Sequence, residues 1–274
     1  MIKLSEIDTS RHQSQAQIIM NNSNTSSLQQ NKVPEITLGF WLIKIMSTTV
    51  GETVADYLAV NADWGHMITT VAMCAFLIIA LFLQLNTSRY IPGIYWLTVI
   101  LVSIVGTQIT DVLTDILNIS LYTSTAVFSV SLAIIFFIWF YVEQTLSIRT
   151  IITRRRELFY WAAILCTFAL GTAAGDLATE ALGLGFKWGV VIFGAFIGVT
   201  LVAWYLSINA VLTFWIAYIL TRPLGASLGD FLTQSSAHGG VGLGSTLTSA
   251  IFLSVILALV SVAHISNIKA FKTN

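Results

Sequence analysis

Hydrophobic residues run along the chain in long blocks that shorter polar segments separate. Eight blocks approach the roughly 20 residues that an α-helix needs to cross the hydrocarbon core of a bilayer. They lie near 37–58, 66–85, 94–117, 122–143, 158–182, 186–206, 210–232 and 243–266. The runs at 37–58 and 210–232 are too polar to be convincing alone, and an internal repeat supports them. The pattern predicts an all-α polytopic membrane protein.

Composition points to the same class. Hydrophobic residues make up 56% of the chain and charged residues 9%, with a mean hydropathy of +0.82. A soluble domain carries about 25% charged residues, so a soluble enzyme is excluded. The unbroken apolar runs exclude a transmembrane barrel, whose strands alternate over about ten residues. Residues 1–34 are polar and predict a disordered cytoplasmic tail, ahead of an eight-helix transmembrane domain over 35–268.

One spacing of tryptophan, glycine and aspartate recurs four times. Each tryptophan follows an aromatic residue, with a glycine ten residues later and an aspartate fifteen residues later. Each unit holds two spans, so the units share one orientation and predict parallel repeats around a pseudo-symmetry axis normal to the membrane. The units cover about 35–86, 90–145, 155–207 and 209–267. The repeat-structural residues are Trp41, Trp96, Trp161 and Trp215, and Gly51, Gly106, Gly171 and Gly225.

Several segments resemble a known family. KVPEITLGFWLIKIMSTTVGETVADYL, TRRRELFYWAAILCTFALGTAAGDLATEALGLGF, TRPLGASLGD and GVGLGSTLTS are similar to an uncharacterised bacterial membrane-protein family. That family consists of four tandem two-helix repeats of unknown function, each with a characteristic tryptophan. The resemblance covers roughly residues 32–266. It implies eight helices in a bacterial inner membrane, and it supplies no activity.

The distribution of basic residues predicts the orientation. Eight spans place both termini on one side, which carries ten lysines and arginines, whereas the other side carries only Lys187. Because cytoplasmic loops are enriched in lysine and arginine, both termini are predicted to be cytoplasmic. The run Arg154–Arg156 is then a topology anchor and not a nucleic-acid site. The four repeat tryptophans are expected at the membrane interface, where they would act as anchors.

The odd-numbered spans carry polar stripes, whereas segments of the even-numbered spans such as VAMCAFLIIALFL and SLAIIFFIWFYV carry no charged residue. Residues four apart share a helix face, so the odd spans are predicted to lie inside and the even spans towards lipid. A charge at mid-span costs about 2.5–3.5 kcal/mol on insertion scales, so packing explains recurrent acids poorly. The acids could instead touch water at the interface. The predicted cation- or substrate-binding residues are Thr48, Glu52, Asp56, Thr107, Asp111, Asp115, Thr172, Asp176, Glu180 and Asp230.

Two cations within the spans, Lys44 and Arg222, are predicted to balance this acidic charge. Arginine stays charged in proteins, so Arg222 needs an anionic partner inside the bundle. Glu52 is an acid that breaks the repeat pattern. Its equivalents are Thr107, Thr172 and Ala226. If the four units close into a ring, the first and fourth are neighbours, and Arg222 is predicted to pair with Glu52 across the seam. The alternative is that Arg222 extends towards the cytoplasmic interface.

Carboxylate and hydroxyl oxygens are ligands for hard cations. The stripes therefore predict a transporter or channel, and not an enzyme, for a divalent metal such as manganese or magnesium, or for a process coupled to protons or sodium. Any metal would bind the same acids, with His66 and His238 as weaker candidate ligands. The expected partners are the lipid bilayer and a small cation, without cofactor or nucleic acid. An intramembrane enzyme using acid–base carboxylate pairs and a structural protein with register-fixing charges remain as alternatives. The transported species and the oligomeric state stay open.

Overall fold

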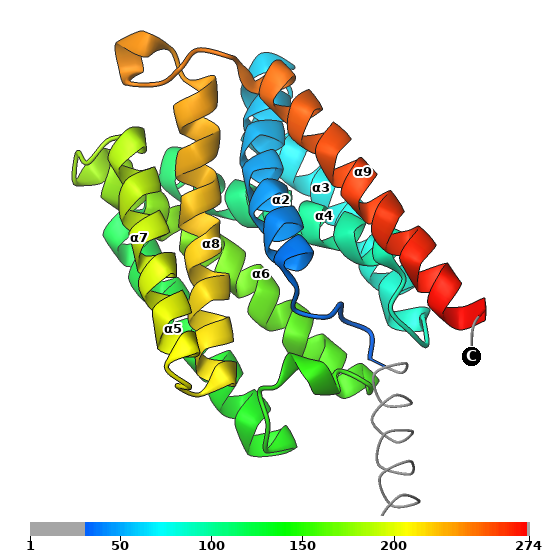
Figure 1. Ribbon diagram of the computed structural model, residues 1–274. Helices are drawn as coiled ribbons and strands as arrows, with labels where there is room; N and C mark the ends of the chain where they lie inside the picture. The colour runs from blue at the N-terminus through cyan, green and yellow to red at the C-terminus, as the bar shows by residue number, and fades with distance from the viewer. Residues whose placement is uncertain (1–30, 273–274) are drawn as a thin grey trace, which may run out of the picture.

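The computed structural model describes residues 31–272, whose regular secondary structure is entirely helical. The first described residues and the end of the last helix lie at the same end of the bundle (Figure 1). Each predicted span corresponds to one of the eight long helices. These are α2 (Leu38–Asp56), α3 (Gly65–Asn86), α4 (Pro92–Asp111), α5 (Leu121–Glu143), α6 (Arg154–Asp176), α7 (Phe186–Tyr205), α8 (Ala210–Thr233) and α9 (Ser245–Lys272).

Seven of these helices are long and apolar enough to cross a membrane. The exception is α2, which carries Lys44, Glu52 and Asp56 within its 19 residues. Helices α4, α8 and α9 pack around α2, so its polar groups face protein and not lipid. The chain is therefore a polytopic membrane protein whose most polar helix is enclosed by the others.

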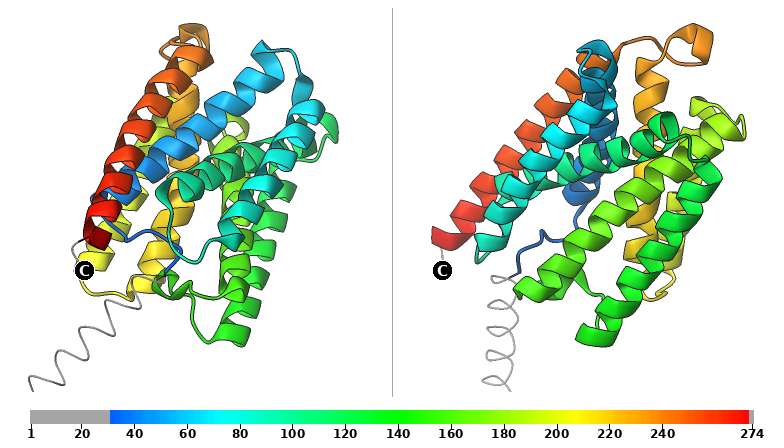
Figure 2. Two further views of the ribbon diagram at one scale, coloured as in Figure 1. Left: turned by 90° about the vertical axis from the view of Figure 1, so that its right-hand side faces the viewer. Right: turned by 180° about the vertical axis from the view of Figure 1, so that it is seen from behind.

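The inner helices α2, α4, α6 and α8 form a closed ring. Each packs against two others, in the cyclic order α2, α4, α6, α8 and back to α2. The outer helices α3, α5, α7 and α9 lie around this ring (Figure 2), and they carry many large apolar side chains that are exposed. The predicted division into inner odd spans and outer even spans is thus confirmed. We refer to the line through the centre of the ring as the axis.

Each outer helix packs mainly on the inner helix of the next repeat. Helix α3 lies on α4, α5 on α6, α7 on α8, and α9 returns to α2. The last of these contacts closes the ring and includes a hydrogen bond of 2.6 Å between the hydroxyls of Thr53 and Ser249. Each inner helix is covered mainly by an outer helix of the preceding repeat, so the four units depend on one another for burial.

The repeat glycines set the spacing of the inner helices. Each one faces the residue seven places after the tryptophan of the following repeat. A Cβ added at any of these glycines would come closer than 3.0 Å to that neighbour, and real Cβ atoms essentially never do so. The pairs are Gly51 with Ser103, Gly106 with Phe168, Gly171 with Arg222, and Gly225 with Thr48. The last pair again closes the ring between α8 and α2.

Replacing a repeat glycine should therefore destabilise the bundle. We expect Gly51→Ala and Gly106→Ala to lower the free energy of unfolding by about 1–3 kcal/mol, because overpacking shifts the backbone. Gly194 and Gly198 on α7 are matched controls, since an added Cβ meets nothing within 4 Å at either position. Their alanine variants should be neutral or slightly more stable. Denaturant titration in detergent measures both sets, and equal losses in the two sets would contradict the role of the repeat glycines.

The expectation that the repeat tryptophans are interface anchors is wrong for three of the four. Trp96, Trp161 and Trp215 are only 2–4% exposed. Each lies in a layer of aromatic side chains. In this layer the tryptophan of one repeat contacts the Phe or Tyr that stands directly before the tryptophan of the preceding repeat. These ring pairs have centroid distances of 5.5–6.4 Å and are Phe40 with Trp96, Tyr95 with Trp161, Tyr160 with Trp215, and Phe214 with Trp41. Packing between repeats therefore holds these side chains inside the bundle.

The predicted boundary between the tail and the transmembrane domain lies too late in the chain. Residues 31–34, expected to be disordered, are buried at the end of the bundle where the tryptophans lie. The Nζ atom of Lys32 is 2.6 Å from the Oε2 atom of Glu157, and the Nε2 atom of Gln84 donates to Oε1 of the same carboxylate at 3.0 Å. This buried ion pair fixes the segment before α2. Residues 1–30 lie outside the described part of the chain.

Candidate functional site

Equivalent residues of the four repeats lie at about the same height along the axis, and we call each such set a level. The aromatic layer forms one end, which we call the tryptophan end, and the aspartates lie at the opposite end, the aspartate end. Between them are the residues seven and eleven places after each tryptophan. The first of these levels holds Thr48, Ser103, Phe168 and Arg222, and the second holds Glu52, Thr107, Thr172 and Ala226.

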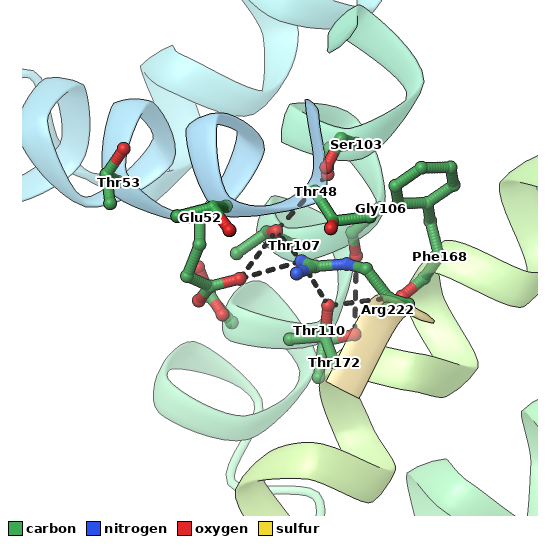
Figure 3. A network of polar contacts seen from close by, with 12 residues as sticks. Thr48, Glu52, Thr53, Ser103, Gly106, Thr107, Thr110, Phe168, Thr172 and Arg222 are labelled. Carbon is green, nitrogen blue, oxygen red and sulfur yellow. Dashed lines mark hydrogen bonds and ion pairs between the residues drawn. The ribbon is translucent and has the colours of Figure 1, made fainter. Parts of the chain in front are cut away.

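Arg222 crosses the axis and touches all three other repeats. It is 1% exposed, and its Nη2 atom donates to Glu52 Oε2 and to Thr172 Oγ1, both at 2.7 Å. The same atom donates to Thr107 Oγ1 (Figure 3). The predicted pair between Arg222 and Glu52 is therefore confirmed, and the alternative of an arginine extended towards the interface is not what the structure shows.

Two small residues leave room for the Arg222 side chain at the axis. Gly171 lies against the first carbons of the arginine side chain, where any larger residue would collide with it. Ala226 occupies the level of Glu52 in the fourth repeat, so this repeat contributes only a methyl group to that level. Helix α8 continues through Pro223 without ending there. The Nε and Nη1 atoms of Arg222 are buried and have no hydrogen-bond partner among the described residues.

Three carboxylates gather beside Arg222 towards the aspartate end. Glu52, Asp56 and Asp230 can each supply one oxygen such that all three oxygens lie within 4.8 Å of one another. Glu52 and Asp230 are buried, and Asp56 is half-buried. Asp111 and Asp176 are also half-buried, and both interact electrostatically with Glu52. The structure thus places Asp56 and Asp230 beside Glu52, with Asp111 and Asp176 close enough to interact with its charge.

Exposure increases from this cluster towards the aspartate end. The side chain of Asp115 is 58% exposed, and Glu180 is exposed as well. The Nδ1 atom of His66 is 3.6 Å from Asp111, and its Nε2 atom is 3.8 Å from Asp115. The weaker candidate His66 therefore joins the acidic region. His238 does not contribute in this way, since its Nδ1 atom lies 2.9 Å from Ser235 Oγ.

A feature that the sequence did not reveal follows three of the aspartates. Directly after Asp56, Asp111 and Asp176 the helix becomes a π-helix for five residues. These π-helices are η1 (Tyr57–Asn61), η2 (Val112–Ile116) and η4 (Leu177–Ala181). In the fourth repeat α8 remains α-helical past Asp230, as far as Thr233. Single-turn π-helical segments within α-helices are frequent at functional sites.

Two predicted site residues do not join the carboxylates. Thr48 donates hydrogen bonds to Ile45 O at 2.5 Å and to Thr221 O at 3.3 Å, so it ties α2 to α8. The Nζ atom of Lys44 lies 4.1 Å from the ring centre of Phe168 and 4.3 Å from that of Tyr218. Lys44 was expected to balance the acids, but aromatic rings surround its amine, and this amine has no hydrogen-bond partner in the described structure. Residue spacing alone could not show which neighbouring helix each side chain meets.

Comparison with known proteins adds the family and no activity. Comparison with curated proteins and with solved structures gave no match. A family described as Repeat of Unknown Function (DUF347) matches four segments of the chain, residues 39–90, 94–145, 159–208 and 213–269. These segments follow the tryptophan repeat and span most of the chain. The protein therefore belongs to the family built from four tandem copies of this membrane repeat.

Proposed function

We propose that this protein carries a cation across the membrane through the cluster of Glu52, Asp56 and Asp230. The observation that carries the proposal is the placing of three carboxylate oxygens within 4.8 Å of one another, deep in the bundle. Acids within membrane helices are costly and are concentrated along substrate and ion pathways. Here two buried acids lie next to the axis, where four repeats meet.

The spacing of the oxygens suits a hard cation. Calcium-like ions bind oxygens at 2.3–2.6 Å, so oxygens on opposite sides of such an ion are about 4.6–5.2 Å apart. Magnesium or manganese would require a slight contraction of the cluster. The donors are carboxylates and hydroxyls without thiolates, which favours hard ions over copper or zinc.

The balance of formal charge favours a divalent ion. When ionised, Glu52, Asp56 and Asp230 carry three negative charges, and Arg222 supplies one positive charge. Within this group of four side chains two negative charges remain, which one divalent cation neutralises. Two protons, or sodium together with a proton, satisfy the same balance, so the proposal includes coupling to monovalent ions.

The two ends of the axis support a carrier more than an open channel. On one side, the exposed Asp115 and Glu180 would attract cations towards the cluster by electrostatic focusing. On the other side, Arg222 crosses the axis and the aromatic layer follows. A cation that reaches Glu52 from the aspartate end therefore meets a closed side, and passage requires a change of conformation.

We further propose that the tryptophan end faces the cytoplasm of a bacterial inner membrane. The support is the concentration of lysine and arginine in the segments at that end, among them Arg149 and Arg154–Arg156. Reporter proteins fused after Asn61, Ser120 or His238 should then all report the external side. A cytoplasmic signal from one of these fusions would contradict this orientation.

Cation flux is the test of the proposed function. Purified full-length protein in vesicles should admit Mn²⁺, Mg²⁺, Na⁺ or protons from a panel offered one at a time, and empty vesicles should not. Glu35→Gln is a matched control, since it removes an exposed carboxylate distant from the cluster and should leave the flux unchanged. No flux of any cation, from folded protein, would favour the enzymatic or structural alternatives.

A further inference from the structure

Glu52 has two possible positive partners, and only one of them belongs to the protein. Its Oε2 atom accepts from Arg222 at 2.7 Å, and the same carboxylate belongs to the cluster with Asp56 and Asp230. A bound cation and the guanidinium would therefore share one carboxylate. Like charges at such short range repel strongly in a buried setting, where little water screens them.

The guanidinium also occupies the axis itself. Its Nη2 atom bonds to Glu52, Thr107 and Thr172, so a single side chain joins the fourth repeat to each of the other three. Any cation that moves along the axis from the carboxylate cluster meets this nitrogen first. Passage therefore requires that Arg222 leave its present position.

Two of the three guanidinium nitrogens give a reason why Arg222 can leave. The Nε and Nη1 atoms are buried without hydrogen-bond partners among the described residues. Unsatisfied buried donors are costly, so the observed position does not use the full bonding capacity of the side chain. The neighbour on the other side is the ring of Phe168, whose centre is 5.7 Å from the Arg222 Cζ atom, a contact that suits a guanidinium.

We propose that Arg222 is a built-in competitor of the transported cation, which occupies the inner side of the carboxylate site and closes the axis until a cation displaces it. The proposal rests on the proposed function, and it assigns to Arg222 the role of a gate. A cation that binds Glu52 weakens the hold of Glu52 on Arg222. The released guanidinium then opens the axis, and its return to Glu52 expels the cation.

Competition between Arg222 and the cation predicts that removal of this buried arginine increases the affinity for Mn²⁺. Arg222→Gln should bind Mn²⁺ more tightly than the unchanged protein, by about tenfold or more, within the 5–150-fold range typical of coupling between two ligands. Arg222→Lys keeps the positive charge at nearly the same place and is the matched control. Its Mn²⁺ affinity should stay within a few-fold of the unchanged protein, because a positive charge still opposes the bound ion.

The experiment is a Mn²⁺ titration of full-length protein in detergent, followed by the electron paramagnetic resonance signal of free Mn²⁺. Equal or weaker binding by Arg222→Gln, or equal gains by the glutamine and lysine variants, would overturn the proposal. If Arg222→Gln does not fold in metal-free buffer, Mn²⁺ present during purification should restore folded protein, because the ion takes the place of the guanidinium. Failure of Mn²⁺ to restore it would equally overturn the proposal.

These outcomes are separate from those that test the proposed function. If neither the unchanged protein nor Arg222→Gln binds Mn²⁺, and no cation crosses the vesicles, the transport function itself fails. If the unchanged protein transports a cation in a manner that depends on Asp56 and Asp230, but removal of Arg222 does not tighten binding, only the competition by Arg222 fails.

Discussion

Asp230→Asn and Asp56→Asn should each weaken Mn²⁺ binding and slow cation flux by at least about tenfold while the protein stays folded. Loss of a group that merely supports a metal ligand commonly costs 10–100-fold in affinity, and a lost ligand should cost no less. The free energy of unfolding, in contrast, should not fall. Each change removes one of several carboxylates gathered around Glu52, so the free energy of unfolding should stay constant or rise.

Asp115→Asn is the matched control for this prediction. It removes the same charge from the same acidic region, but the Asp115 side chain is 58% exposed at the aspartate end. Its effect on Mn²⁺ affinity should be a few-fold at most, and adding salt should reduce it, because water and ions screen exposed charges. Equal losses in Asp115→Asn and Asp230→Asn would indicate general attraction of cations and would contradict a defined site.

The ion pair between Arg222 and Glu52 should show strong coupling in a double-mutant cycle. In metal-free buffer, Arg222→Gln or Glu52→Gln alone should lower the free energy of unfolding by about 3–5 kcal/mol, because each leaves an uncompensated buried charge. The double variant should lose less than the sum of the two. Denaturant titration in detergent gives the four free energies, and purely additive losses would show that the pair has no energetic role.

A second buried ion pair, Lys32 with Glu157, provides the comparison. It has an N–O distance of 2.6 Å and lies at the tryptophan end, away from the carboxylate cluster. Its own cycle should also show coupling, since both side chains are less than 10% exposed. Mn²⁺ should not change that coupling, whereas it should reduce the coupling between Arg222 and Glu52. Equal responses of the two pairs to Mn²⁺ would argue against direct competition at Glu52.

Much of the architecture follows from the sequence, because membrane helices leave few options. Backbone groups in lipid must bond within the same helix, so apolar runs locate the eight helices closely. The register of tryptophan, glycine and aspartate placed the acids on the inner helices. Glu52 and Arg222 have no charged equivalents in the other repeats, and they could be paired because four parallel units that close into a ring bring the first and fourth together.

Other features depend on contacts that one helix at a time does not reveal. The tryptophans looked like interface anchors because each lies near the start of a span, yet the close approach of the inner helices encloses three of them. Lys44 lies on the same stripe as Glu52, but it ends between Phe168 and Tyr218 because those rings come from two other helices. The π-helices after the aspartates have no recognised signal in residue type or spacing.

The most direct test of the central claim is to locate a bound ion. Crystals of the full chain grown with Mn²⁺ should give an anomalous-scattering peak between Glu52, Asp56 and Asp230, with carboxylate oxygens about 2.0–2.6 Å away. The same crystals would show whether the guanidinium of Arg222 has moved away from Glu52. Anomalous peaks only beside the exposed acids Asp115 and Glu180, in a protein shown to transport Mn²⁺, would contradict a cation site on the axis.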